Sequence, residues 1–203
     1  MSTPQVLQSG VTLYFVRHGE TDWNRARRLQ GQIDIPINDL GRSQARRNGE
    51  VLRGTLSPET LSALDYVASP LSRTRETMEI VRDAAGLSPG AYETDPRLME
   101  IKYGTWEGAY LDELKRGDPD AFQERRDNKF GWRPENGESY RDLTERVRDW
   151  LQSVTRDTVV VSHGGVSRVV RGLITPIAED DIPVQIVPQD KVMICRHGSF
   201  DWL

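Results

Sequence analysis

The chain has 203 residues, of which 36% are hydrophobic and 29% charged, and its formal net charge is −4. That length is enough for one full hydrophobic core, so we expect a flexible N-terminus at 1–10 and a single domain at 11–203. The weak negative charge disfavours a binder of nucleic acid or anionic membranes, and no apolar run reaches the roughly 18 residues that span a bilayer. The single cysteine excludes an internal disulfide, and residues 1–10 lack a secretion signal, so we expect a cytoplasmic protein.

Four apolar segments are typical of β-strands, namely residues 11–17, 65–69, 158–162 and 191–195. Continuous apolar runs such as TVVV indicate strands that are covered on both faces, as in a parallel sheet. The segments between them predict helices over 39–53 after an Asn38 cap, over 70–85 with Ser69-Pro70 at its start, over 138–154 and over 165–173. This alternation predicts an α/β fold, with a mostly parallel sheet in a three-layer α/β/α sandwich.

Residues 104–137 differ from the rest because they are rich in glycine, proline and charge. They contain only short helical patterns, at 109–116 and 118–127, and we expect an excursion over the end of the sheet where α/β folds bind ligands. Its cations are best interpreted as a solvated helix face: Arg116, Arg125, Arg126, Lys129 and Arg133. If some of them point inward, the substrate carries extra negative charge. Phe130 and Trp132 would instead line an apolar part of the pocket.

Three polar turns follow the first three predicted strands. Arg17-His18-Gly19 ends the first strand, and His163-Gly164 ends the third. Arg73 lies in the first turn of the helix after the second strand, where free amides and the helix dipole favour an anion. A histidine supplies a neutral ring nitrogen near pH 7, and the planar guanidinium of arginine matches phosphate oxygens. The three turns together predict a phosphate site that has a histidine nucleophile.

A carboxyl group for general acid catalysis comes from the stretch LMEIKYGTWEG, residues 98–108. Glu100 and Glu107 lie there among apolar side chains, and such surroundings would raise the pKa of a carboxyl toward neutrality. The residues alone do not choose between these two glutamates.

Other phosphatase chemistries lack their residues in this chain. No cysteine lies six residues before an arginine, no D-x-D-x-T/V motif follows an apolar strand, and no dense His/Asp cluster could hold two metal ions. We therefore expect a phosphoryl transfer that needs neither a metal nor another cofactor.

Four motifs carry a family resemblance: RHGETDWN at 17–24, SPLSR at 69–73, MEIKYGTWEG at 99–108 and SHGG at 162–165. In this order they resemble the histidine phosphatase superfamily, the phosphoglycerate-mutase-like proteins. IPINDLG at 35–41 and PENGES at 134–139 are also similar to the family, so the resemblance extends from about residue 11 to 173.

The resemblance implies a role for each matching residue. His18 would be the nucleophile that becomes phosphohistidine, Glu100 the proton donor, and Glu107 a neighbour of structural or secondary importance. The groups around the phosphate would be Arg17, Arg73 and His163, with Asn24 and the Gly164 amide as further donors. A dianionic neighbour would raise the pKa of His163. Arg75 falls outside the matching position and is interpreted as a surface residue.

The superfamily contains phosphatases and mutases, and its mutases carry a longer basic insertion between the acid and the second histidine. The segment between Glu100 and His163 is compact here, which favours a phosphatase acting on small phosphorylated metabolites. The alternatives are a cofactor-dependent phosphoglycerate mutase and a non-catalytic phospho-ligand-binding module, although such modules usually lose the nucleophile or the acid.

The C-terminal part of the chain repeats the tripeptide Arg-His-Gly at 196–198, without the continuation seen after His18. We interpret this second copy as a plain turn before a short final strand. An edge strand at 192–203 would support a homodimer, and ordinary completion of the sheet explains it equally well.

Overall fold

The computed structural model describes residues 6–196 and 198–203, which form a six-stranded sheet in the order β3-β2-β4-β1-β5-β6. The strands are β1 Leu13–Arg17, β2 Asp65–Ala68, β3 Glu93–Thr94, β4 Thr158–Ser162, β5 Val192–Arg196 and β6 Ser199–Trp202. The neighbours β1–β4, β4–β2 and β2–β3 are parallel, whereas β5 and β6 are antiparallel to their neighbours. The predicted mostly parallel sheet is confirmed. Gly198 adopts a φ of 79° between β5 and β6, and His197 lies outside the described residues.

The helices are α1 Asp22–Arg25, α2 Asp39–Thr55, α3 Pro58–Ala63, α4 Ser72–Ala84, α5 Leu111–Gly117, α6 Pro119–Asp127, α7 Tyr140–Ser153 and α8 Gly164–Ile174. Three 3-10 helices join them: η1 Pro96–Leu98, η2 Gly104–Trp106 and η3 Glu179–Val184. The four long predicted helices and the two short ones of the excursion are present. Pro70 was expected in the first turn of its helix, but α4 begins at Ser72, so Pro70 belongs to the preceding loop.

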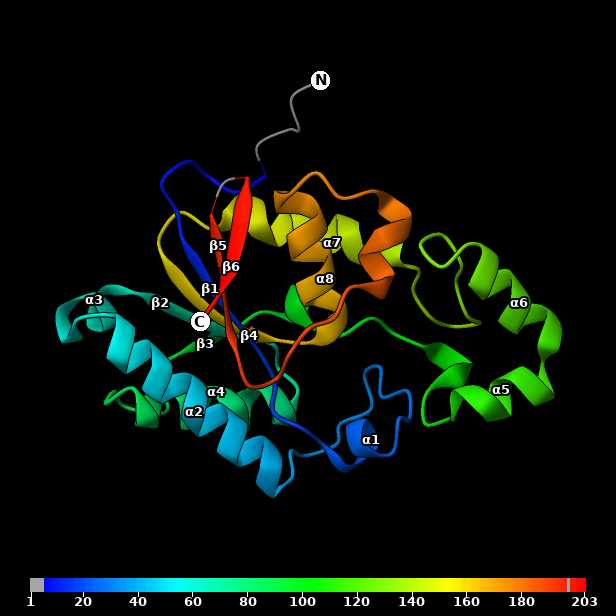
Figure 1. The fold of residues 1–203 in the computed structure, drawn as a ribbon, viewed down its shortest axis with the longest axis horizontal. Helices are drawn as coiled ribbons and strands as arrows, with labels where there is room; N and C mark the ends of the chain where they lie inside the picture. The colour runs from blue at the N-terminus through cyan, green and yellow to red at the C-terminus, as the bar shows by residue number, and fades with distance from the viewer. Residues whose placement is uncertain (1–5, 197) are drawn as a thin grey trace.

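The three-layer sandwich is confirmed, because helices cover both faces of the sheet (Figure 1). Alternate side chains of β1 point to opposite faces, as the pleat requires. Tyr14 and Val16 pack in a cluster with residues of α2 and α4, while Leu13 and Phe15 pack in a cluster with residues of α7 and α8. Both faces of the central strands are therefore buried.

The segment at 1–10 was expected to be flexible, and this is wrong for Val6 and Leu7, which are buried in the cluster on the α7–α8 face. Residues 1–5 lie outside the described part. Among the described residues, no helix is long and apolar enough to cross a membrane.

The sheet register brings the polar turns of the sequence to one edge. Arg17 pairs with Ser162 at the ends of β1 and β4, and Ala68 of β2 pairs with Val161. Because parallel strands end at the same edge, the residues that follow them meet there. The excursion, which contains α5 and α6, stands apart from the sheet to the right in Figure 1.

Candidate active site

His18 is the first residue after β1, and its backbone N–H donates to the Ser162 carbonyl at 2.8 Å. The ring Nδ1 lies 2.8 Å from the Gly19 carbonyl, which can only accept, so Nδ1 carries the proton and Nε2 keeps its lone pair. Burial, followed by the charges of Arg73 and Arg17, holds the pKa of His18 well below its ordinary value. The ring is therefore neutral at pH 7, with the electronic form that a nucleophile needs.

Gly19 is needed because the chain packs backbone against backbone at this turn. Any Cβ at this position would collide with the backbone of Gly41, in the first turn of α2. The Gly19 amide donates to Thr77 Oγ1 at 3.1 Å, which ties the turn to α4. The carbonyl that orients His18 is thus held by two helices.

His163 precedes α8, and its ring centroid lies 5.2 Å from that of His18 in an edge-on arrangement. Its Nε2 lies 2.8 Å from Ser69 Oγ, a hydroxyl that can donate or accept, so this hydrogen bond is compatible with either tautomer of the ring. Nδ1 is buried and has no partner among the described residues. Burial, followed by the charge of Arg73, lowers the pKa of His163 well below its ordinary value, so the ring is neutral at pH 7.

Two arginines, Arg17 and Arg73, lie beside His18 and His163, and we call these four residues the inner pocket. Arg17 donates from Nη1 to the Val187 carbonyl at 2.8 Å, and burial lowers its pKa to about 10, which leaves it protonated at pH 7. The fully buried Arg73 donates to the carbonyls of Gly31 at 2.7 Å and Ile33 at 2.8 Å. Among the described residues neither guanidinium has a carboxylate partner. Two buried cations that have no ion-pair partner in the described part of the chain indicate an anion site.

The start of α4 differs from what we expected. Its free amides were predicted to bind the ligand anion, but Asp34 already lies there, and its Oδ1 accepts from the Ser72 amide at 2.9 Å and the Ser72 hydroxyl at 2.7 Å. The Asp34 carboxylate therefore occupies the positive end of the α4 dipole. Arg73 reaches the anion site with its side chain instead. Arg75 is exposed, as expected.

The structure separates the two glutamates that the sequence left open. Glu100 lines the cavity, and its carboxylate accepts from the amides of Ile101 at 2.9 Å and Gly165 at 3.0 Å. The apolar surroundings that we expected are thus replaced in part by backbone donors. Glu107 lies behind the cavity wall, where its Oε1 accepts from the amides of Gln32 at 2.9 Å and Tyr103 at 3.1 Å.

Asn24 is oriented by its acceptor atom. The amide of Thr21 and the side chain of Gln189 both donate to Asn24 Oδ1, each at 3.2 Å. With the oxygen fixed in this way, the Nδ2 group of Asn24 remains as the donor that it presents at the cavity.

A cavity of about 170 Å³ opens at this edge of the sheet. Its walls are Arg17, His18, Asn24, Arg28, Leu29, Gln30, Gly31, Arg73, Glu100, Tyr103, Gly164 and Arg168. All the predicted site residues line it except His163, which is buried beside His18. Sequence reasoning missed the wall at 28–31 and Arg168. Arg168 lies about one turn after Gly164, and helical side chains lean toward the N-terminus, so its position was a usable signal.

The excursion does not line this cavity but adjoins it at Tyr103. Arg125, Lys129 and Trp132 line a neighbouring small cavity with Tyr103, so the expected solvated face is wrong for Arg125 and Lys129. It holds for Arg116 and Arg126, which are exposed. Of the two remaining residues, Arg133 pairs with Asp142, and Phe130 is buried in the core.

No group of three or more His, Cys, Asp or Glu that could hold a metal occurs in the described part of the chain.

Comparison with known proteins identifies the family of the chain. Residues 13–202 match the model of the histidine phosphatase superfamily, branch 1. A relative from Erwinia tasmaniensis named "Probable phosphoglycerate mutase GpmB" is 36% identical over 157 residues, which cover 75% of this chain and 69% of the relative. A mycobacterial glucosyl-3-phosphoglycerate phosphatase in complex with VO3 is structurally similar, with a TM-score of 0.78, 26% identity and coverage of 96% and 97%. A protein from Thermus thermophilus has a TM-score of 0.69, 35% identity and coverage of 91% and 92%.

The α/β sandwich and the anion pocket at its edge define an enzyme that acts on phosphate monoesters. The chain belongs to the histidine phosphatase superfamily.

Proposed function

We propose that this protein is a metal-independent phosphomonoesterase that hydrolyses small phosphorylated metabolites through a phosphohistidine on His18. The observation that carries the proposal is the state of His18, whose Nδ1 is bound to the Gly19 carbonyl and whose pKa is held low by burial and by two arginines. A buried neutral imidazole between buried cations is suited to attack on a phosphoryl group.

In the first step, Nε2 of His18 forms a bond to phosphorus while the bond from phosphorus to the substrate oxygen breaks. Glu100, in its protonated form, gives its proton to the departing oxygen, so an alcohol leaves and a carboxylate remains. Arg17 and Arg73 stabilise the charge on the equatorial oxygens, because they are already in place and need no reorganisation.

In the second step, the Glu100 carboxylate takes a proton from a water molecule, whose oxygen attacks the phosphohistidine. The bond from nitrogen to phosphorus breaks, inorganic phosphate leaves, and both His18 and Glu100 return to their starting states. His163, Asn24 and the Gly164 amide serve as neutral donors to the phosphoryl oxygens in both steps.

Two observations support hydrolysis of small substrates. The cavity of about 170 Å³ has room for a phosphoryl group and a small alcohol. The similar mycobacterial structure is that of a phosphatase. The names of the curated relatives favour a second candidate, a phosphoglycerate mutase, in which the phosphohistidine returns its phosphoryl group to a bound sugar acid instead of water.

An aryl phosphate assay with and without a chelator tests the proposal. We expect turnover that the chelator leaves unchanged, an acid-labile phosphoenzyme after rapid quenching, and loss of both in His18→Ala. The proposal is wrong if wild-type protein releases no phosphate from a panel of phosphomonoesters, or if the chelator abolishes the release. Exchange of phosphate between the positions of phosphoglycerate that depends on bisphosphoglycerate would instead establish the mutase.

A further inference from the structure

The segment that carries Glu100 has little regular structure of its own. It runs from η1 to Lys102 outside the sheet, so its carbonyl and amide groups need partners elsewhere. A general acid on such a segment must be held by other side chains, since a small misplacement of a catalytic group costs much of its effect.

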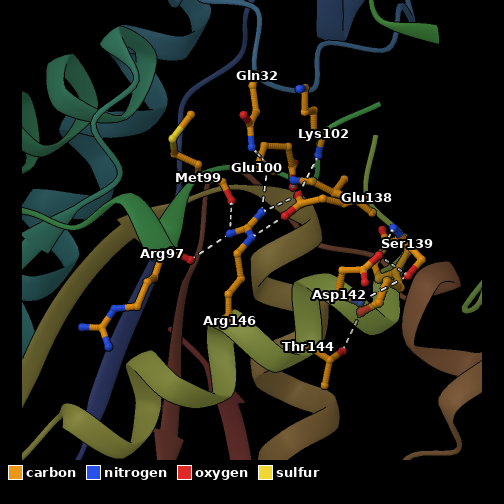
Figure 2. A network of polar contacts seen from close by, with 12 residues as sticks. Gln32, Arg97, Met99, Glu100, Lys102, Glu138, Ser139, Asp142, Thr144 and Arg146 are labelled. Carbon is orange, nitrogen blue, oxygen red and sulfur yellow. Dashed lines mark hydrogen bonds and ion pairs between the residues drawn. The ribbon is translucent and has the colours of Figure 1, made fainter. Parts of the chain in front are cut away.

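Arg146 of α7 supplies the partners for three of these carbonyl groups (Figure 2). Its Nη1 donates to the carbonyls of Arg97 at 2.8 Å and Met99 at 2.7 Å, and its Nη2 donates to the carbonyl of Glu100 at 3.0 Å. The side chain is only 19% exposed, so these hydrogen bonds are shielded from water. One guanidinium thus binds three carbonyl groups of the segment that carries Glu100.

Glu138 completes the arrangement from the segment that precedes α7. Its carboxylate pairs with Arg146 through two bonds of 2.9 Å, from Nε to Oε1 and from Nη2 to Oε2. Oε2 also accepts from the Lys102 amide at 2.9 Å, and the Glu138 amide donates to the Lys102 carbonyl at 2.8 Å. We call this pair the Arg146–Glu138 clamp, and we call residues 97–102 the acid segment. The clamp holds the acid segment on both sides of Glu100.

Hydrogen bonds also connect the clamp to the residues that hold Arg73. The Glu100 carbonyl accepts a second hydrogen bond, from Gln32 Nε2 at 3.0 Å, so both of its lone pairs are used. Gln32 lies between Gly31 and Ile33, whose carbonyls hold Arg73. The position of the acid and the position of the buried arginine are therefore set by one connected set of hydrogen bonds.

We propose that Arg146 is a positioning residue, which through its pairing with Glu138 places the Glu100 carboxyl at the cavity for proton transfer. This inference rests on the proposed role of Glu100 as general acid and base. Arg146 is absent from the cavity wall, and its hydrogen bonds go to Glu138 and to the carbonyls of residues 97–100.

The leaving group of the substrate provides a test that a merely structural role would not pass. Proton donation matters greatly for an alkyl phosphate and little for p-nitrophenyl phosphate, whose leaving group is stable as an anion. For Arg146→Met we expect kcat/KM, which reports the steps up to the departure of the leaving group, to fall roughly 10- to 100-fold with glycerol 3-phosphate but less than about 3-fold with p-nitrophenyl phosphate. The later attack of water on the phosphohistidine is the same for both substrates and does not enter this comparison.

Arg133→Met is the matched control. Arg133 also pairs with a carboxylate of α7, Asp142, but its side chain is 59% exposed and it makes no contact with the acid segment among the described hydrogen bonds. We expect this variant to keep the leaving-group ratio of the wild type. In a Glu100→Ala background, Arg146→Met should have almost no further effect with glycerol 3-phosphate, since the two residues act as one unit.

Each outcome decides the question. An equal loss of kcat/KM with both substrates, or no loss in a folded variant, overturns the positioning role of Arg146 while leaving the phosphatase activity established. If Arg146→Met does not fold, Arg146→Lys, which keeps the charge but loses the planar fork, and Glu138→Gln are measured in the same way. Inactivity of the wild-type protein toward both substrates would instead contradict the proposed function.

Discussion

The inner pocket and the excursion differ in how they are built. In the inner pocket, His18, Arg73 and His163 are almost completely buried and bonded to groups that the strand ends and the loops beside them bring together. In the excursion, α5 and α6 contain no buried residue. The proposed groups for phosphoryl transfer thus lie on the buried part of the fold, whereas α5 and α6 can change with little effect on the core.

Removal of the nucleophile is the strongest test of the inner pocket. We expect His18→Ala to lower kcat/KM by at least about 10³-fold, because the remaining donors can bind phosphate but cannot form the covalent intermediate. Arg75→Ala, which changes an exposed residue of α4, should retain wild-type activity. Steady-state kinetics with an aryl phosphate measures both variants. Substantial activity in a folded His18→Ala protein would contradict the covalent mechanism.

Gly165→Ala adds a single methyl group to the inner pocket, beside Glu100. A Cβ there would collide with the carboxylate of Glu100, which at present accepts from the Gly165 amide. We expect kcat with an alkyl phosphate to fall about 10²-fold through displacement of the acid.

Gly54→Ala is the control for this glycine variant, since Gly54 lies in α2 and its Cβ would meet open space. It should keep full activity and raise stability by about 0.5–1 kcal/mol through helix propensity. Equal activity of the two variants would show that the contact with Glu100 is unimportant.

Residues that follow strands could be predicted from the sequence, and residues that reach the site from elsewhere could not. His18 and His163 each come directly after the last residue of a predicted strand, and parallel strands bring their ends together. Asp34 binds the start of α4 across 38 positions of sequence, and no local pattern marks that contact. Similarly, Gln189 orients Asn24 from a distant loop. The choice between Glu100 and Glu107 needed the family resemblance, because both have similar neighbours along the chain.

The two buried histidines should make stability depend on pH. Burial lowers the pKa of both His18 and His163, so the unfolded chain binds protons near pH 6.5 while the folded protein does not. The stability that the two neutral histidines contribute is fully present above pH 6.5 and is lost as the pH falls below that value. Below pH 6.5 we expect the free energy of unfolding to fall by about 1.4 kcal/mol per pH unit for each histidine. Denaturant unfolding at several pH values should show the combined slope of both histidines in the wild type and about half of that combined slope in His18→Gln, which keeps only His163.

The excursion should respond to mutation far less than the inner pocket does. Burial and the nearby charges of Arg125 and Arg168 lower the pKa of Lys129, so these cations lie close together beside Tyr103. Since they repel one another, Lys129→Met removes an unfavourable contact as well as a charge that attracts substrate. We expect kcat to stay unchanged and KM for phosphomonoesters to rise only a few-fold, roughly the effect of a charge at the rim of a binding site.

Arg116→Met, which alters an exposed cation of α5, is the control for Lys129→Met and should change neither constant. A large fall in kcat for Lys129→Met would mean that the excursion takes part in the chemical step, and the division between the two regions would then be wrong. A rise in KM that is confined to substrates with a second anionic group would support the division between the two regions. Phosphoryl transfer would then belong to the inner pocket, and recognition of the leaving alcohol would belong to residues beside Tyr103.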